Sequence, residues 1–275
     1  MNIHTSLKGQ PYKHFLIIGK TGTGKSSLCN CLAGHDYNEN IFEVSSESQS
    51  CTQRIKFGTA FFGGNKERRV ALIDTIGFDD PNDDTDARII AELVDKLKNS
   101  CDSVHLFGIA VNGQSPRLDG SLVAMIKIFE EMFGEQFWKQ CVLIFTRMPM
   151  DEKSQRRRMK TQGKSDEQWA LDYIKGVEEK FPEAKGGLQH LFLDACYEKE
   201  DEAETGAFHE SLEELYQRLS SADPLPTSNV NENMENMIMI TKMNESAIDT
   251  GNVLRRLEAL LEGEQQKIAD CESDN

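Results

Sequence analysis

The sequence lacks the features of a membrane-spanning, secreted or nucleic-acid-binding protein. It has no run of 18 apolar residues, and its N-terminus does not show the charged-then-apolar layout of a signal peptide. Positive charge is scarce, because 31 Lys and Arg residues stand against 46 Asp and Glu residues, for a net charge of −15. An acidic surface repels nucleic acid and anionic membranes, so no nucleic acid is expected as a partner. With no lipidation signal at the C-terminus, we expect a soluble, cytoplasmic protein.

The sequence also lacks a cysteine spacing that suggests pairing. The seven cysteines are odd in number and scattered: Cys29, Cys31, Cys51, Cys101, Cys141, Cys196 and Cys271. This pattern argues against a disulfide framework and against a metal site built from cysteine. We therefore expect reduced thiols, most of them in the core.

One glycine-rich stretch carries the strongest signal in the chain. It reads Gly19, Lys20, Thr21, Gly22, Thr23, Gly24, Lys25, Ser26 and Ser27, and it matches G-x-x-x-x-G-K-[ST] between an apolar run and a helix-forming segment. Backbone N–H groups of such a loop converge on phosphate, and the following helix points its positive end at the same place. Lys25 is expected to bridge the β- and γ-phosphates, and Ser26 to hold Mg²⁺. A plain turn between strand and helix is the alternative.

A second motif follows the short apolar strand expected over 69–74. Asp74 ends this strand, at the edge where parallel sheets bind ligands, so it can reach Mg²⁺ through water. The Gly77 N–H can meet a γ-phosphate, which would let this stretch sense the third phosphate. Between the two motifs, the Thr52 hydroxyl is the candidate to complete the Mg²⁺ shell, with Ser50 as its competitor and a plain Ser-rich loop as the alternative.

The order of the elements predicts the fold class. Short apolar strands alternate with amphipathic helices, as in a right-handed, doubly wound sheet. We expect an α/β, three-layer P-loop domain with a mostly parallel central sheet over 12–221, after an N-terminal tail over 1–11. A linker over 222–229 and a helical extension over 230–275 follow. The extension's apolar pattern is too broken for a coiled coil, so docking on the domain and pairing with another helix both stay open.

Recognition of a nucleotide base is the weakest part of the pattern. A guanine-reading site usually carries N/T-K-x-D after a buried strand; Thr146 and Arg147 fit, but Pro149 stands at the Asp position. Arg147 can still stack on a purine. After the last strand, further base contacts are expected from the backbone of Asp194, Ala195 and Cys196.

Taken together, these motifs resemble the immunity-associated GTPases of the GIMAP or AIG-type family, which is grouped with septins and plastid import-receptor GTPases. The resemblance covers about residues 12–220 and includes the phosphate loop, Asp74 to Phe78, the stretch 111–117 and the Thr-Arg element. The chain departs from the family at Pro149, and at 118–120 it matches the family's Thr-x-Glu only weakly. The resemblance implies binding of GTP and GDP with Mg²⁺, slow hydrolysis, and a homodimer or oligomer formed across the nucleotide face.

Two cations are the candidate catalytic residues, Lys25 and Arg117. Phe78 stands where faster relatives place a water-orienting Gln, so the residues themselves also favour slow hydrolysis. Arg117 lies in the stretch that resembles the family's Gly-Arg box and is expected to reach a partner's phosphates; a solvated loop arginine is the alternative. Two other functions stay open, a hydrolysis-inactive scaffold that binds nucleotide and an ATP-using P-loop enzyme.

The basic run over 153–164 stands out on an acidic chain. Contact with an effector, a peripheral membrane surface or a neighbouring subunit's nucleotide is one interpretation, and a solvated segment is the other.

Overall fold

A computed structural model of the chain describes residues 2–36, 42, 55–75, 77, 93–228 and 230. Ser50, Thr52, Phe78 and the extension expected beyond residue 230 lie outside these residues. Within the described ranges, no helix has both the length and the apolar character needed to cross a membrane.

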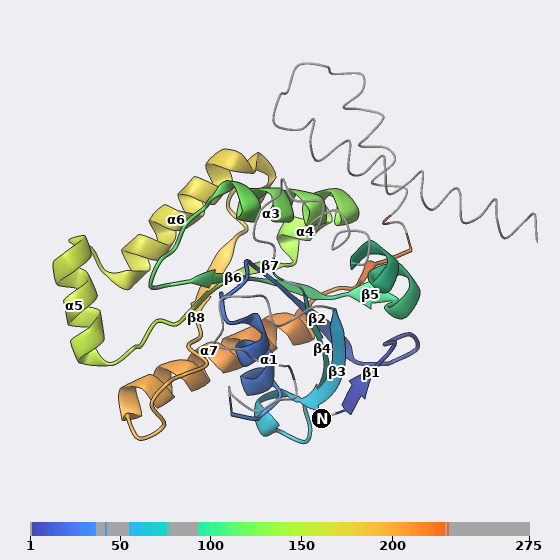
Figure 1. The fold of residues 1–275 in the computed structure, drawn as a ribbon, viewed down its shortest axis with the longest axis horizontal. Helices are drawn as coiled ribbons and strands as arrows, with labels where there is room; N and C mark the ends of the chain where they lie inside the picture. Colours follow the sequence, from blue (N-terminus) through green and yellow to red (C-terminus); the bar gives the residue numbers. More distant parts are fainter. Residues whose placement is uncertain are drawn as a thin grey trace, which may run out of the picture.

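A seven-stranded sheet forms the middle of the domain, with its strands in the order β1-β3-β4-β2-β6-β7-β8 (Figure 1). The strands β4, β2, β6, β7 and β8 are parallel to one another, whereas β3 pairs antiparallel with both of its neighbours, β4 and β1. The strands span Asn2–His4 (β1), Lys13–Ile18 (β2), Lys56–Phe61 (β3), Arg69–Asp74 (β4), Leu106–Asn112 (β6), Cys141–Thr146 (β7) and Gln189–Phe192 (β8). The mostly parallel sheet predicted from the sequence is confirmed.

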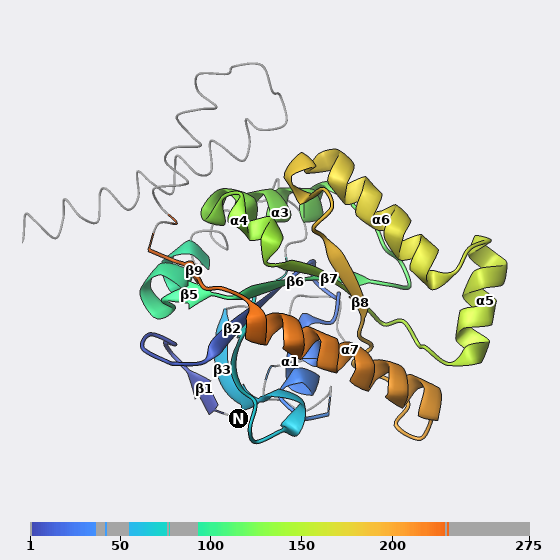
Figure 2. The same ribbon diagram turned by 180° about the vertical axis from the view of Figure 1, so that it is seen from behind.

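Helices cover both faces of this sheet (Figures 1 and 2). On one face lie α3, α4 and α6, and on the other lie α1 and α7. The helices span Lys25–Leu32 (α1), Gly120–Phe133 (α3), Gln136–Lys139 (α4), Glu152–Gln162 (α5), Asp166–Lys180 (α6) and Glu202–Ser221 (α7), with short 3-10 turns at Phe62–Gly64 and Pro182–Ala184. Residues 93–100 are also helical and pack in the same core as α3. This confirms the three-layer α/β fold class.

Alternating side chains of the central strand β2 enter two separate cores. Leu16 and Ile18 pack in the cluster that includes α3, while Phe15 and Ile17 pack in the cluster that includes α1 and α7. A strand buried on both faces has no side for polar residues, which explains its continuous apolar sequence. Because β2 is central, the loop after it leaves the middle of the carboxyl edge of the sheet, where open α/β sheets bind ligands.

The segment expected to be a linker contains a short strand, β9 (Leu225–Pro226). It pairs antiparallel with β5 (Ser103–Val104), and the Thr227 N–H donates to the carbonyl of Asp102 over 3.1 Å. Val230 is fully buried in the core that holds α3. Residues after α7 are therefore packed on the domain at 225–227 and at Val230. The domain boundaries stay predictions.

Free cysteines in the described part of the chain are mostly buried, as expected. Cys29, Cys31, Cys101 and Cys141 lie in the interior, whereas Cys196 is exposed. Cys196 is exposed because it lies on the loop that leaves the sheet after β8.

Candidate nucleotide site

The phosphate loop joins the end of β2 to the start of α1, as its sequence predicts. Gly24 precedes the helix with φ 87°, a left-handed conformation that glycine adopts without strain. At Gly19 a side chain would not fit, because an added Cβ would lie 2.6 Å from the carbonyl oxygen of Ala110. The first turn of α1 contains no acidic residue and no side chain caps it. The positive end of the helix is therefore directed at the loop without an internal carboxylate to neutralise it.

Lys25 is the first residue of α1, and its side chain folds back over the loop. It is only 6% exposed, and its Nζ donates to the carbonyls of Gly19 at 2.9 Å and Lys20 at 3.0 Å. These contacts hold the ammonium group at the mouth of the loop. The charge that phosphates need is thus held in position by the loop itself.

Ser26 and Asp74 meet beside the loop, although they come from α1 and from the end of β4. The Ser26 hydroxyl donates to Asp74 Oδ2 over 2.7 Å, while Asp74 Oδ1 is buried and has no hydrogen-bond partner among the described residues. Burial raises the pKa of Asp74 to about 6. A hydroxyl next to an unpaired, buried carboxylate oxygen is the donor set that a hard divalent cation prefers, so these residues fit Mg²⁺. Thr52, the third expected ligand, lies outside the described residues.

Gly77 lies directly against the phosphate loop. A Cβ added there would come within 2.5 Å of both the backbone nitrogen and Oγ1 of Thr21. Thr21 Oγ1 is itself buried without a hydrogen-bond partner in the described part of the chain. The residue expected to sense a third phosphate and an unpaired hydroxyl therefore occupy the same edge of the loop.

Thr146, the last residue of β7, contacts the backbone of the phosphate loop. It is 2% exposed, and its hydroxyl lies 2.6 Å from the carbonyl of Thr23 and 3.2 Å from that of Val111. Sequence reasoning places Thr146 among the base contacts, but its side chain is already engaged by these carbonyls. Its observed contacts position the loop.

The other residues expected at the base come together from two loops. Arg147 is exposed and has φ 55°, an uncommon left-handed conformation for a residue other than glycine. Asp194 Oδ1 accepts from the Cys196 N–H over 2.9 Å. Burial raises the pKa of Asp194, although the Cys196 N–H and the Arg147 charge act in the opposite direction. Asp194 and Cys196 are thus joined within one loop, and the Arg147 charge acts on the pKa of Asp194 from the other.

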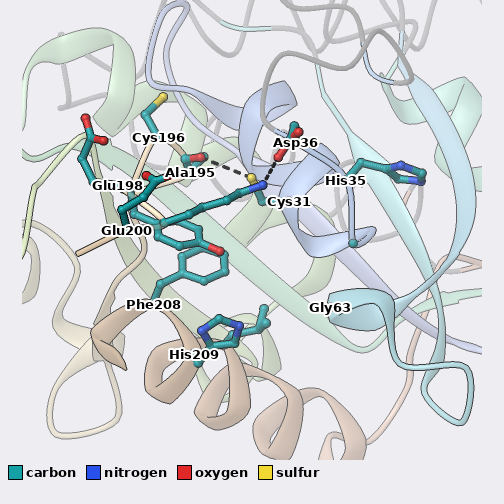
Figure 3. A pocket seen from close by; sticks show the side chains of 14 residues that line it. Cys31, His35, Asp36, Gly63, Ala195, Cys196, Glu198, Glu200, Phe208 and His209 are labelled. Carbon is teal, nitrogen blue, oxygen red and sulfur yellow. Dashed lines mark hydrogen bonds and ion pairs between the residues drawn. The ribbon is translucent and has the colours of Figure 1, made fainter. Parts of the chain in front are cut away.

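A cavity of about 680 Å³ adjoins these base-site residues (Figure 3). Its lining includes Ala195 and Cys196, together with Cys31 at the end of α1 and Phe208 on α7. The Tyr197 ring stacks on Phe208 with centroids 4.2 Å apart, and an ion pair joins Lys199 to Asp36 on the wall. Sequence reasoning did not find this cavity, because its walls come from segments far apart in the chain.

Arg117, the second candidate catalytic cation, lies beside the phosphate loop of its own chain. It is exposed and lines a second cavity, of about 340 Å³, together with Lys20 to Thr23 and Asp119. The Lys20 Nζ lies 2.5 Å from Asp119 Oδ2 across this cavity's edge. Sequence reasoning missed the Lys20–Asp119 contact, for which the chain carries no local signal.

The basic run forms α5, whose side chains are all at least partly exposed. Three cations of the run are paired within the chain: Arg158 with Asp166 at 2.7 Å, Arg156 with Glu152 at 3.1 Å and Lys164 with Asp172 at 2.6 Å. The structure agrees with the solvated interpretation for Arg156, whereas the Arg158 side chain is only 16% exposed.

Comparison with known proteins agrees with this geometry. The model of the AIG1 family matches residues 13–165, which is more than half of the chain. No curated protein matches the chain. The fold is similar to that of Toc33 from Arabidopsis thaliana in complex with GDP and Mg²⁺, with a TM-score of 0.53 and 17% identity over 80% of this chain and 89% of that one.

Two further solved forms of Toc33 are similar. The complex with Mg²⁺ and GMPPNP has a TM-score of 0.52 and 16% identity, over 78% of this chain and 88% of that one. A dimerization-deficient mutant has a TM-score of 0.53 and 17% identity, over 78% and 84%. At this identity the likeness shows a shared fold. Through the family match over more than half of its length, the chain belongs to the AIG1 family.

Proposed function

We propose that the chain binds GTP and GDP with Mg²⁺, hydrolyses GTP slowly, and acts as a switch whose GTP form pairs two copies across the nucleotide face. The assembled phosphate site carries this proposal. Lys25 is held over the loop by two carbonyls, and the Ser26 hydroxyl contacts Asp74 at 2.7 Å. The cation, the helix end and the oxygen donors all meet at one point of the sheet edge.

The site has the charge needed for a triphosphate. Lys25 and the uncapped start of α1 supply positive charge, and the loop's N–H groups supply donors. Ser26 and Asp74 would hold Mg²⁺, with Thr52 as a further expected ligand. When bound, the metal neutralises phosphate charge during phosphoryl transfer. The residues of the loop bind and orient the phosphates.

Guanine is the base we propose. Arg147 supplies a flat cation for stacking, and Asp194 and Cys196 form a connected loop beside it. Membership of the AIG1 family supports guanine, and Toc33, which is similar in fold, was solved with GDP. Because Pro149 removes the usual carboxylate contact, the preference over ATP is expected to be smaller than about 1–3 kcal/mol, the value of a good bidentate base contact in nucleic-acid readout.

Pairing across the nucleotide face is supported by the position of Arg117. The residue is exposed beside the phosphate loop, where a second copy could meet it. An arginine delivered by a partner accelerates related phosphoryl transfers by about 10³–10⁵. Phe78 in the sequence favours the second candidate function, a scaffold that binds nucleotide without hydrolysing it.

Two measurements on the purified chain test the proposal. One is titration with fluorescent GTP, GDP and ATP, with and without Mg²⁺, and the other is the GTP hydrolysis rate over a range of chain concentrations. We expect Mg²⁺-dependent binding of GTP and GDP, weaker binding of ATP, and a hydrolysis rate per molecule that rises with chain concentration. Tighter ATP binding would exclude guanine preference. Binding without any hydrolysis at high chain concentration would favour the scaffold.

A further inference from the structure

Lys20, the second residue of the phosphate loop, has a contact that the nucleotide-binding motif does not require. Its Nζ donates to Asp119 Oδ2 over 2.5 Å, across 99 residues of sequence. The Lys20 backbone takes part in the loop itself, because its carbonyl accepts from Lys25 Nζ at 3.0 Å and from the Thr23 hydroxyl at 2.9 Å. Lys20 therefore joins the phosphate-binding backbone to an acidic side chain outside the loop.

Asp119 is fixed on its other side by the start of α3. Its Oδ1 accepts from the Leu122 N–H over 3.2 Å and from the Ser121 hydroxyl over 3.3 Å, so the residue caps the helix. Burial acts to raise the pKa of Asp119, but the contacts with Lys20 and Leu122 outweigh it and leave this pKa lowered. An ionised carboxylate beside a triphosphate would be repelled, and Lys20 supplies the cation that offsets this repulsion.

Asp119 is also the last residue of the loop that carries Arg117, which runs from the end of β6 to the start of α3. At the other end of this loop, the Gly113 N–H donates to the carbonyl of Thr146 over 2.8 Å, and an added Cβ on Gly113 would lie 2.7 Å from the sulfur of Met148. Arg117 is exposed between these two anchors, and it has no ion pair or hydrogen bond with the described residues. Its position therefore depends on the anchors and not on contacts of its own.

We propose that the Lys20–Asp119 ion pair couples the phosphate loop to the Arg117 loop, and that Asp119 is a positioning residue for hydrolysis in the paired state. The proposal rests on the proposed function and deepens it. Phosphates that fix the loop backbone also fix Lys20, which holds Asp119 and hence the end of the Arg117 loop. Without the pair, Arg117 samples more positions and meets a second copy's phosphates less often.

Charge-removing variants that keep the helix cap test this coupling. Asn and Ser cap helices about as well as Asp, so Asp119→Asn and Asp119→Ser should keep α3 intact. Lys20→Gln removes the other charge. For each variant, for Lys20→Gln combined with Asp119→Asn, and for the native chain, we would measure GTP affinity and the hydrolysis rate per molecule against chain concentration. Glu152→Gln, which removes the Arg156–Glu152 pair on α5, is the matched control.

At high chain concentration each single variant is expected to hydrolyse GTP about five- to tenfold more slowly, within the range of coupling between linked sites. The double variant should be no slower than either single one, because both remove the same pair. In the two Asp119 variants, GTP affinity and the rate at low concentration should stay near native, whereas Lys20→Gln should bind GTP more weakly because it leaves the Asp119 carboxylate without its cation. Native rates in the single variants, or effects that multiply in the double variant, would overturn the inference while leaving the proposed function standing.

Hydrogen exchange of residues 113–118 gives a readout that does not depend on hydrolysis. In the native chain, GDP should slow exchange in this loop, and in Asp119→Asn it should not. Equal slowing in both chains would overturn the coupling. A native hydrolysis rate that is flat with concentration would instead overturn the proposed pairing and, with it, the role of Asp119 in hydrolysis.

Discussion

The Ser26 hydroxyl donates to Asp74 Oδ2 over 2.7 Å, although 48 residues separate the two in sequence. The contact joins the start of α1 to the end of β4, so it links the two motifs that the sequence alone identifies. The other carboxylate oxygen, Asp74 Oδ1, is buried and has no hydrogen-bond partner within the described residues. The fold therefore contains a carboxylate that is arranged for a cation and is costly to bury without one.

Asp74→Asn is expected to stabilise the chain in the absence of nucleotide while removing the effect of Mg²⁺. Burial raises the pKa of Asp74 to about 6, so ionisation of this group at pH 7 opposes folding. An amide of the same shape avoids that cost, and the gain should be about 1–3 kcal/mol in the free energy of unfolding. Urea unfolding at pH 7 and GTP titration with and without Mg²⁺ would show both effects. A less stable variant that keeps its Mg²⁺ dependence would contradict this role for Asp74.

Lys25→Met should abolish most nucleotide binding without unfolding the chain. Methionine keeps much of the volume of the lysine stem but removes the charge that is held over the loop. Since hydrogen bonds to charged groups contribute about 1.5–3 kcal/mol each, GTP affinity should fall by about 30-fold or more. The thermal melt should stay close to native, as should that of Lys139→Met, an exposed control. Undiminished affinity in a folded Lys25→Met chain would show that the central assignment is wrong.

Substitutions of Arg147 by Gly and by Ala should differ in their effect on stability but have the same effect on nucleotide binding. Its φ of 55° is strained for a side-chain-bearing residue, so Arg147→Gly is expected to stabilise the chain by about 0.5–1 kcal/mol. Arg147→Ala retains the strain and is the matched control. Both variants lose the guanidinium, and both should bind GTP more weakly. If GTP affinity is native in both, Arg147 does not contact the base.

Acid should destabilise the fold through His14 and His105. His105 Nδ1 accepts from the His14 backbone N–H over 3.1 Å, so protonation there would break a buried hydrogen bond. Burial lowers the pKa of His105 to about 4, below the unfolded value of 6.5. The unfolded chain binds more protons between these values, so stability is lost as pH falls from about 6.5 towards 4.

His105→Asn tests this pH dependence, because its Oδ1 can accept the same N–H. Between pH 7 and pH 5 the native chain should lose about 2 kcal/mol more unfolding free energy than the variant. Denaturant curves at the two pH values give the comparison. Equal losses would assign the acid sensitivity to other groups.

Features that depend on spacing along the chain were the most predictable from the sequence. The phosphate loop and Asp74 were found because a glycine pattern after a strand and a carboxylate at a strand end have local signatures. The strand expected over 69–74 matches β4 at both ends, since its apolar run is bounded by charged residues. These features depend on neighbouring residues, so they are visible before folding is known.

Contacts between distant segments were not predictable in this way. The Lys20–Asp119 pair spans 99 residues, and the cavity beside Ala195 is built from α1, the loop after β8 and α7. For Thr146, the sequence motif suggested a contact that differs from the one in the folded chain. Its motif position suggested a base contact, but folding brings its hydroxyl 2.6 Å from the Thr23 carbonyl. Residue type and spacing identify a candidate, whereas the packed partner decides its role.

Arg117→Ala should remove the dependence of hydrolysis on chain concentration. Arg117 is exposed at the edge of the phosphate loop, and Phe78 leaves the sequence without an internal water-orienting side chain. A second copy can supply the missing cation, so the rate per molecule of the native chain should rise with concentration. The variant should stay flat and be at least about tenfold slower at the highest concentration. Arg157→Ala, an exposed arginine on α5, should behave like the native chain, whereas a rising rate in Arg117→Ala would remove Arg117 from catalysis.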